Sequence, residues 1–505
     1  MGQARCIQIK KEDNVAVATR DIQAGTEVFP GLTTKQDIPQ AHKITLRDIS
    51  RGEAILRYGV VLGYARDFIP EGSLVSEHML SLPEPPGLDS LTFGAQIAVN
   101  LPDPPVMSWE GYEVSGEAYG GTRNILGIHT TVQCVAGVLN AAVDKIRREI
   151  LPRYPAVDGV VPVNHAYGCG VAIHAPEAIV PIRALQNLVK HPNFGGIIMA
   201  VGLGCEKLTA DRLLPPDANK PENLILLQEQ KGFGQMVAAI CAMAERKLAL
   251  LNQRKRSALP LSKLMIGFQC GGSDAFSGIT ANPAAGYASD MLVKGGATVL
   301  FSEVTEVRDG VHLLAQRCVS EEVGKKLIRE MAWYDRYLQE GSVDRSANPT
   351  PGNKKGGLAN IVEKAMGSIA KSGTAPIIDV LAPAERPRRV GLHFAATPAS
   401  DFVCGPCQLA SGIGIQVFMT GRGTPYGLAS IPVVKVCSRN ELKEQWPDLI
   451  DVNAGPVITG EASIADIGLL LFREIIETAS GRKKSFAEAY GLYNDLCIFN
   501  PAPIT

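Results

Sequence analysis

The chain has 505 residues, of which 46% are hydrophobic and 20% are charged, and its formal net charge is −1. A chain of this length can form roughly two to four globular domains with large cores. The near-zero charge argues against a nucleic-acid partner, and no apolar stretch is long enough to span a membrane. The N-terminus lacks the apolar segment of a secretory signal. Eleven irregularly spaced cysteines fit reduced thiols in a cytoplasmic protein better than a disulfide framework.

The residue pattern changes three times along the chain. Residues 1–82 contain short runs rich in Val, Ile and Tyr, separated by turn residues, which predicts a small β domain. Residues 83–108 contain six prolines and predict an extended, exposed linker. Beyond them, apolar runs alternate with helical patterns, which predicts two α/β domains, 109–258 and 259–505, with parallel sheets covered by helices.

Four cysteines share one local setting, because each follows an apolar run that is expected to be a strand. They are Cys134, Cys169, Cys205 and Cys270, and three of the runs also carry a polar companion: His165, Glu206 or Asp274. A lone cysteine of this kind is usually a small buried hydrophobe. Ligands, however, bind beyond the carboxyl ends of parallel strands, and the ligand spacing is too wide for a zinc ribbon. We expect these side chains to meet at one rim as a metal or substrate site.

Two polar, glycine-rich stretches suit an anion. Residues 348–357, NPTPGNKKGG, contain Asn353, Lys354 and Lys355, and residues 420–427, TGRGTPYG, contain Arg422 and Thr424. Arginine binds a carboxylate through two parallel hydrogen bonds, and glycine lets backbone approach a ligand. The pair suits a doubly anionic small molecule, with phosphate or plain surface turns as the alternatives. No GxGxxG motif points to a dinucleotide.

Other candidates have weaker signals. His42 lies at a strand start in the β domain, where a histidine is more often structural. Cys404 and Cys407 form a C-x-x-C sequence, for which a redox motif and a glycine-rich turn are both possible explanations.

Several longer stretches resemble the altronate/galactarate dehydratase family. They include DNVAVATRDIQAGTEV, NHAYGCG, QCGGSDAFSGITANPAAGYASD, NPTPGNKKGGL and TGRGTPYG, and the resemblance covers nearly the whole chain. FSEVTEVRDGVHLL and the terminal FNPAPIT resemble the galactarate branch more than the altronate branch, although Pro406 and Cys407 depart from that branch. The resemblance implies an N-terminal β-clip domain of the SAF type, a larger catalytic α/β part and a homodimer. It also implies a divalent metal, first iron(II) with manganese or magnesium as alternatives, and loss of water from a sugar diacid. Altronate or another sugar acid is the alternative substrate.

The implied reaction assigns roles to these residues. An α-proton is removed next to a carboxylate, a cation stabilises the resulting enediolate, and an acid protonates the leaving hydroxyl. The metal candidates are His42, Cys169, Cys205, Glu206 and Asp274. The base candidates are His165 and then Lys354, and His42 is a ligand or the acid. The candidates for substrate binding are Arg422, Arg308, Lys355, Asn353 and Thr424.

Overall fold

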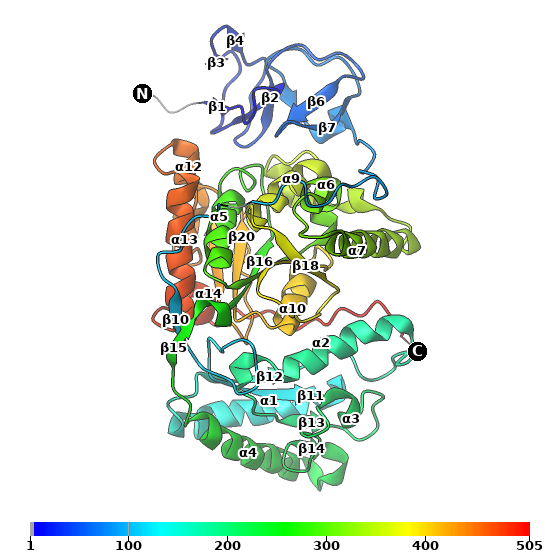
Figure 1. Ribbon diagram of the computed structural model, residues 1–505, viewed down its shortest axis with the longest axis vertical. Helices are drawn as coiled ribbons and strands as arrows, with labels where there is room; N and C mark the ends of the chain where they lie inside the picture. The colour runs from blue at the N-terminus through cyan, green and yellow to red at the C-terminus, as the bar shows by residue number, and fades with distance from the viewer. Residues whose placement is uncertain (1–4, 99, 505) are drawn as a thin grey trace.

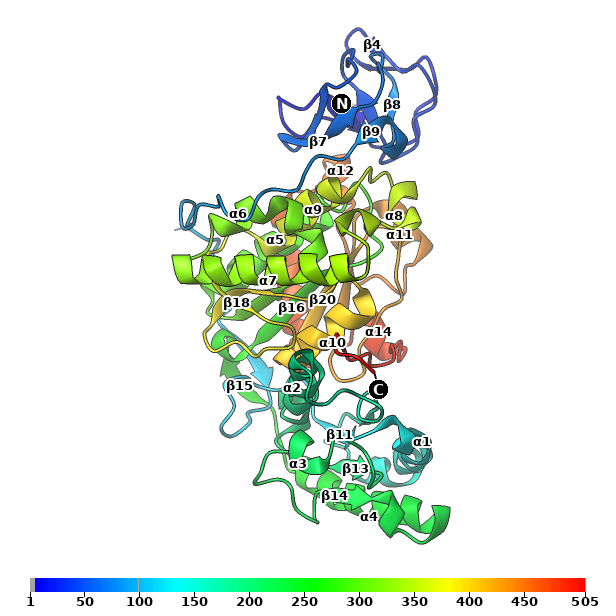
Figure 2. The ribbon, with the colours of Figure 1, turned by 90° about the vertical axis from the view of Figure 1, so that its right-hand side faces the viewer.

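The computed structural model describes residues 5–98 and 100–504. Figures 1 and 2 show three bodies along the long axis, with the N-terminal β domain at one end, the C-terminal α/β domain in the middle and the second domain at the far end. The predicted α/β class, with parallel sheets covered by helices, is confirmed. Among the described residues, no helix has both the length and the apolar character that a membrane crossing requires.

The β domain consists of short antiparallel strands. One sheet has the order β1-β2-β5-β8, a second has the order β6-β7-β9, and β3 pairs with β4. The bounds are β1 Cys6–Ile7, β2 Val15–Ala18, β3 Glu27–Phe29, β4 Leu32–Thr33, β5 Lys43–Thr45, β6 Ala54–Arg57, β7 Val60–Ala65, β8 Leu74–Val75 and β9 Leu80–Ser81. The run at 54–65 is a hairpin, because Tyr58 and Gly59 both have positive φ values, 60° and 73°. Two such residues form the tight turn that matches strand twist.

The proline-rich segment between β9 and β10 (Ser108–Gly111) contains no helix or strand among its described residues. It is nevertheless attached to the C-terminal domain. Arg345, Arg308 and Lys294 donate hydrogen bonds to the carbonyl oxygens of Pro83, Pro86 and Leu101 at 2.6, 2.9 and 2.7 Å. Proline has no backbone donor but keeps its acceptor, so these cations hold the segment in place.

The second domain has a four-stranded parallel sheet with the order β12-β11-β13-β14. Its elements are β11 Ile125–Thr130, β12 Gly159–Val163, β13 Ala200–Gly202, β14 Leu224–Leu226, α1 Ala136–Lys145, α2 Ile179–Val189, α3 Ala210–Leu213 and α4 Gly232–Leu251. The chain passes from β11 to β12 on one side and then to β13 on the other. The switch point of this sheet therefore lies between β11 and β13.

The C-terminal domain has a seven-stranded parallel sheet with the order β18-β19-β17-β16-β20-β21-β22. Its strands are β16 Met265–Cys270, β17 Thr298–Phe301, β18 Ile377–Leu381, β19 Gly391–Ala395, β20 Ile415–Thr420, β21 Val433–Cys437 and β22 Val452–Asn453. The sheet's switch point lies between β16 and β20. The antiparallel pair of β10 and β15 (Ser257–Pro260) joins this domain to the second domain.

Helices cover the sheet of the C-terminal domain (Figures 1 and 2). They are α5 Ala281–Lys294, α6 Val311–Ala315, α7 Glu321–Glu340, α8 Pro351–Lys355, α9 Ile361–Ile369, α10 Asp401–Ser411, α11 Asn440–Gln445, α12 Pro456–Thr459, α13 Ile464–Ala479 and α14 Phe486–Ala489. Buried residues of α5, α13 and the strands form one core, so the sheet's carboxyl edge is held rigidly.

A buried charge group attaches the β domain to the carboxyl edge of this sheet. Lys43 of β5 lies 2.9 Å from the carboxylate of Glu363 on α9, Arg57 of β6 pairs with the same carboxylate, and all three side chains are at most 1% exposed. The two cations also donate to backbone carbonyls of the C-terminal domain, Gly357 at 2.6 Å and Ala275 at 2.8 Å. Each buried charge thus has a partner across the domain boundary.

We predict that Glu363→Ala destabilises the docked protein by about 3–5 kcal/mol, because it leaves two buried cations without their anion. Urea unfolding and the rate of proteolysis within residues 83–107 measure the effect. Glu53→Ala is the matched control. Glu53 pairs with Arg47 at the surface of the β domain, and the loss of this pair should cost less than about 1 kcal/mol. Equal stability of the two variants would contradict the prediction.

Candidate functional site

The loops that follow β16 and β20 interlock at the switch point of the large sheet. Asp274 is buried between them and accepts hydrogen bonds from Ser277 N at 2.8 Å and from Ser438 Oγ at 2.9 Å. Burial raises its pKa, against the opposing charge of Arg439. A Cβ on Gly421 would overlap the Asp274 carboxylate, so only glycine fits there. The carboxylate of Asp274 is therefore already engaged by its own loop and by Ser438, which follows β21.

The expected anion-binding residues gather around these loops. Arg422 is exposed, and its backbone N–H donates to Gly272 O at 2.8 Å. Thr424 Oγ1 lies close to Gly272 as well. Asn353 is buried and donates from Nδ2 to Ser273 O at 2.8 Å, so it connects α8 to the β16 loop. Lys355, at the end of α8, is exposed.

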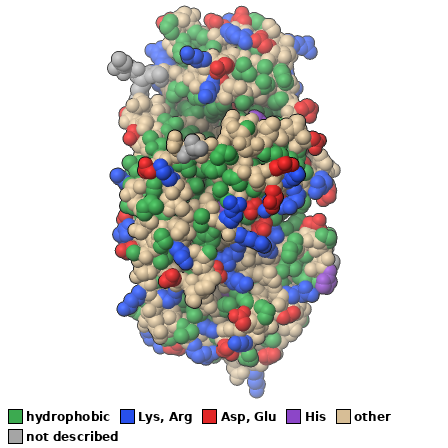
Figure 3. Space-filling model, viewed as in Figure 1, with side chains coloured by type: hydrophobic (Ala, Val, Ile, Leu, Met, Phe, Trp, Pro, Cys, Tyr) green, Lys and Arg blue, Asp and Glu red, His purple; other side chains and the backbone are tan. Residues whose placement is uncertain are grey.

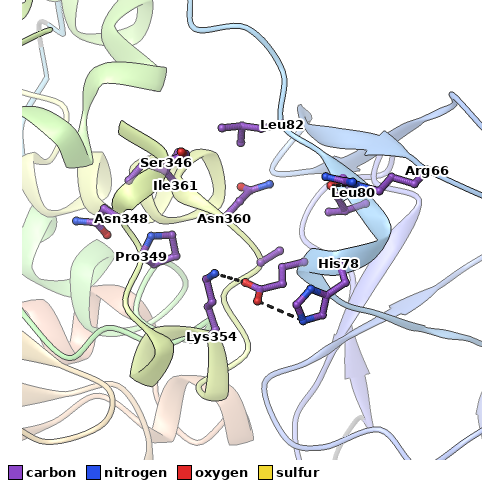
Figure 4. Close-up of a pocket in the computed structure, with 12 residues that line it drawn as sticks. Arg66, His78, Leu80, Leu82, Ser346, Asn348, Pro349, Lys354, Asn360 and Ile361 are labelled. Atoms are coloured by element: carbon purple, nitrogen blue, oxygen red, sulfur yellow. Dashed lines mark hydrogen bonds and ion pairs between the residues drawn. The ribbon is translucent and has the colours of Figure 1, made fainter. Parts of the chain in front are cut away.

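Two cavities of about 420 and 430 Å³ lie between the β domain and α8. Figure 3 shows the surface hollowed where the two domains meet. In Figure 4, Lys354 extends from α8 towards the β domain, where it pairs with Glu77 at 2.5 Å, and His78 lies beside this pair. Both cavities are lined by Glu77, His78 and Lys354, so this ion pair separates them.

His42 of the β domain lines the 430 Å³ cavity together with Lys354 and Lys355. Its Nδ1 lies 3.1 Å from Gln40 O. Because a carbonyl only accepts, this contact places the hydrogen on Nδ1 and leaves Nε2 as the basic atom. Burial lowers the pKa of His42, which favours the neutral imidazole at pH 7. The docked β domain therefore supplies a neutral histidine to a cavity that is also lined by the two lysines of α8, Lys354 and Lys355.

Beneath the loops lies a fully buried charge cluster, which we call the edge cluster: Cys270, Glu303, Glu306, Lys364 and Lys371. Lys371 Nζ lies 3.2 Å from Cys270 Sγ and pairs with Glu303, and Lys364 Nζ lies 2.7 Å from Glu306. Burial, together with the charge of Glu306, raises the pKa of Glu303 to about 8. Burial raises the pKa of Cys270 to about 12. Glu303 also has a positive φ of 80°, a strained conformation that is concentrated at functional sites.

The edge cluster has a donor set that fits one metal ion. Donor atoms of Cys270, Glu303 and Glu306 lie within 4.8 Å of one another, and Glu303 Oε1 is buried without a hydrogen-bond partner. A void of about 10 Å³ adjoins Cys270, which is close to the volume that one water molecule or ion needs. Its lining includes Ser273 and Asn282, whose Oγ and Oδ1 are also buried without partners.

The expected single rim is wrong, because the second-domain candidates lie far from Asp274. Carbonyl groups at the amino end of β20 contact the second domain, where His191 approaches Ile413 O at 3.0 Å and Thr122 donates to Gly414 O at 2.6 Å. Asp274 lies beyond the opposite end of the sheet, about 20 Å away at the rise of a six-residue strand. His165, Cys169, Cys205 and Glu206 follow the strands of the second domain instead.

The polar side chains of that group are already engaged. His165 Nε2 lies 2.8 Å from Thr130 O, and its Nδ1 accepts from Tyr167 N at 3.2 Å. Burial lowers its pKa to about 4, so it is a neutral structural imidazole with no free nitrogen for base catalysis. The Glu206 carboxylate accepts from Gly204 N and Cys205 N at 2.7 and 2.8 Å. Both side chains shape loops.

Arg308, Cys404 and Cys407 also lie outside the cavities. Arg308 pairs with Asp335 at 2.9 Å and holds the linker through Pro86, so it does not face a substrate carboxylate. Cys404 and Cys407 are buried on α10, and the expected turn is a helix. Burial raises the pKa of Cys407 to about 12, and that of Cys404 is raised as well, which is unfavourable for thiol exchange.

Sequence reasoning missed Glu303 and Glu306. Both follow β17 in FSEVTE, and polar residues after a buried strand were the available signal. Lys364 and Lys371 carried no signal, because a lysine on a helix is normally exposed.

Three family models match successive parts of the chain. They are the altronate/galactarate dehydratase SAF domain at residues 4–83, the second domain of D-galactarate dehydratase/altronate hydrolase at 111–252 and the C-terminal part of D-galactarate/altronate dehydratase at 261–504.

Similar proteins match at full or nearly full length. Galactarate dehydratase (L-threo-forming) of Escherichia coli (strain K12) is 54% identical over 99% of this chain and 97% of its own. Altronate dehydratase of Bacillus subtilis (strain 168) is 34% identical over 94% and 95%. The beta subunit of (2R)-sulfolactate sulfo-lyase from Chromohalobacter salexigens is 30% identical over 74% of this chain and 92% of its own.

We predict that the folded protein loses stability as the pH is lowered, because His165 is buried as a neutral imidazole. The folded-state pKa of His165, about 4, lies below the unfolded value of 6.5, so the unfolded chain takes up the proton first. The stabilisation is complete above pH 6.5 and is lost as pH falls towards 4. His165→Asn keeps an acceptor for Tyr167 N and should flatten the decline in melting temperature between pH 7 and 5. An unchanged decline in the variant would contradict this.

Proposed function

The chain belongs to the altronate/galactarate dehydratase family, and from that premise we propose that it removes water from galactarate, a sugar diacid, to give a keto-deoxy diacid. The observation that carries this proposal is the cavity between the SAF domain and α8. It is lined by the α8 lysines Lys354 and Lys355 and by a neutral histidine, His42, and Arg422 is exposed on the adjoining loop. A diacid dehydration requires cations for two anionic ends and a group that takes up one proton and delivers one.

Cationic residues bind the two carboxylates in this scheme. Arg422 has a planar fork that suits a carboxylate, and Lys355 is exposed at the end of α8, where it attracts the other end of the substrate. Binding both carboxylates fixes which carbon of the substrate faces the catalytic group. The binding energy is thereby used to orient the substrate. Thr424 beside Gly272 supplies a hydroxyl on the same loop.

His42 is the proton-transfer residue that we propose. Its Nε2 is basic and its pKa is lowered, so at neutral pH it accepts a proton without first losing one. Lys354 is the second candidate, but its ammonium already pairs with Glu77. The proton accepted by Nε2 remains available for the leaving hydroxyl.

Cys270, Glu303 and Glu306 would hold the metal that the family implies. A divalent cation there would supply charge compensation for the enediolate. The mixture of a soft thiol and hard carboxylates favours iron(II) over magnesium. Homodimer formation and a cytoplasmic location stay predictions from the sequence.

Altronate is the alternative substrate. It has one carboxylate, and the altronate dehydratase of Bacillus subtilis is 34% identical to this chain, against 54% for the galactarate dehydratase of Escherichia coli. Having both Lys355 in the cavity and Arg422 exposed on the adjoining loop favours the diacid.

We predict that the purified protein, reduced and supplied anaerobically with iron(II), converts galactarate to a keto acid much faster than it converts altronate. Arg422→Gln should raise KM for galactarate roughly 10–100-fold, the loss expected for a hydrogen bond between charged groups. Its effect on altronate should be smaller if Arg422 binds the distal carboxylate. A semicarbazide assay of the keto product measures all rates.

Arg482→Gln is the control for this experiment, because Arg482 is an exposed cation that pairs with Glu477 of α13. No keto product from galactarate with iron, manganese or magnesium would exclude the proposed function. Equal losses for both substrates in Arg422→Gln would exclude the assigned contact only.

We predict that His42→Gln lowers kcat about 10²–10⁴-fold, the usual contribution of a positioned acid or base, with KM changed only a few-fold. In the unmodified enzyme kcat/KM should fall on the acid side at a pH below 6.5, since the pKa of His42 is lowered from that value. The variant should lose this acid limb. His78→Gln is the matched control, because His78 lines the same cavity with an exposed ring.

A further inference from the structure

The second domain has a set of three exposed thiols that the proposed function does not use. Cys134, Cys169 and Cys205 are exposed, whereas the other eight cysteines are buried or half-buried. Cysteine is among the most buried residue types, so three exposed ones in a single domain call for an explanation.

The topology brings these three thiols to one edge. Cys134, Cys169 and Cys205 follow β11, β12 and β13, which are adjacent parallel strands in the order β12-β11-β13. The switch point between β11 and β13 is where an open sheet of this kind forms its crevice. The loops of Cys134 and Cys205 therefore lie on the two sides of the crevice, with the Cys169 loop next to them.

Contacts between the loops confirm that they pack together. A Cβ on Gly168, next to Cys169, would lie 2.1 Å from Thr131 O and 3.2 Å from Val132 Cα, two to three residues before Cys134. Thr131 Oγ1 in turn donates to Glu206, next to Cys205. The backbone N–H of Lys207 closes the ring by donating to Gly168 O at 3.0 Å. Each cysteine is thus at most three residues from a contact with another cysteine's loop.

Two of the loops present their cysteine in the same way. Gly168 and Gly204 directly precede Cys169 and Cys205, and each has a φ of 116°, which side chains other than glycine rarely adopt. Cys134 lies in the 3₁₀ turn that leads into α1. The backbone therefore holds three sulfur atoms outward at one edge.

Three thiols at one edge suit a polynuclear cluster better than a single ion. A single ion binds thiolates at about 2.3 Å, so its sulfur ligands lie within about 4 Å of one another. Among the described residues, these thiols do not form a set within 4.8 Å. An iron–sulfur cluster accepts wider spacing because its own width separates the ligands, and thiolates are its usual ligands.

We propose that Cys134, Cys169 and Cys205 bind a four-iron iron–sulfur cluster at the switch point of the second domain. One iron has no cysteine ligand, because Cys241, the remaining cysteine of this domain, is buried in the core on α4. His165 and Glu206 do not replace it, since their polar atoms are engaged in the loops. That iron is open to water or to an anionic small molecule. The site is separate from the edge cluster and does not rest on the proposed dehydration.

The test is metal and sulfide analysis of the full-length protein, isolated anaerobically or reconstituted with ferrous iron and sulfide. We expect about four iron and four acid-labile sulfide per chain, beyond the one iron that the edge cluster would hold, with the broad visible absorption of such clusters. Cys134→Ser, Cys169→Ser and Cys205→Ser should each remove most of the labile sulfide and the absorption. Cys241→Ala and Cys497→Ser are the controls and should keep both.

A second measurement covers variants that fail to fold. In the unmodified holoprotein the three thiols should resist alkylation, and they should react together after chelation of iron under air, as mass spectrometry of peptides reports. Iron or zinc bound without sulfide, or full labile sulfide in the Cys169→Ser, Cys205→Ser double variant, would overturn the proposal. Iron bound at the edge cluster alone would also lack labile sulfide, so the two sites are distinguishable.

Discussion

The carboxylate of Glu363, buried between Lys43 and Arg57, is the interaction on which the arrangement of the catalytic part depends. Two cations in a water-free interface are tolerated only while their anion is present, so the β domain has one stable docked position. Each of those cations has a chain neighbour that lines a cavity. His42 precedes Lys43 and lines a cavity, and Tyr58 follows Arg57 and lines the void at the edge cluster. The buried charges of the interface thereby fix the positions of His42 and Tyr58, which the β domain contributes to cavities of the C-terminal domain.

Each α/β domain has its own sheet with its own switch point. For this reason the four similar strand ends do not form one site. In each sheet the chain reverses direction once, between β11 and β13 or between β16 and β20, and polar residues collect at that crevice. Cys134, Cys169 and Cys205 belong to the first sheet and Cys270 to the second. A sequence shows that a strand ends in cysteine, but the sheet to which the strand belongs depends on long-range pairing that residue patterns do not encode.

Strongly periodic segments were predictable, and elements that depend on tertiary context were not. Apolar residues recur at helical spacing within 136–151, 236–251 and 358–373, and these segments correspond to α1, α4 and α9. The 20-residue helix α7 went unassigned, although Val323, Leu327 and Met331 are buried on one face. The cavity residues His42, Lys354 and Lys355 were all found from sequence. Their meeting depends on domain docking, and the partners of His165 depend on the backbone of a neighbouring strand.

The charge balance of the edge cluster limits how a metal enters it. Glu303 and Glu306 are neutralised by Lys371 and Lys364, and a further divalent charge in this dry interior would be as unfavourable as any unpaired buried ion. A cation can therefore bind only together with loss of positive charge from the same cluster. Two acids of the cluster would supply the protons: Glu303, whose pKa burial raises to about 8, and Cys270, whose thiol contacts Glu306 at 3.4 Å and Lys371 at 3.2 Å. Binding of a divalent ion at this cluster would therefore accompany the loss of these protons, and the buried lysines would oppose any cation too weakly thiophilic to drive it.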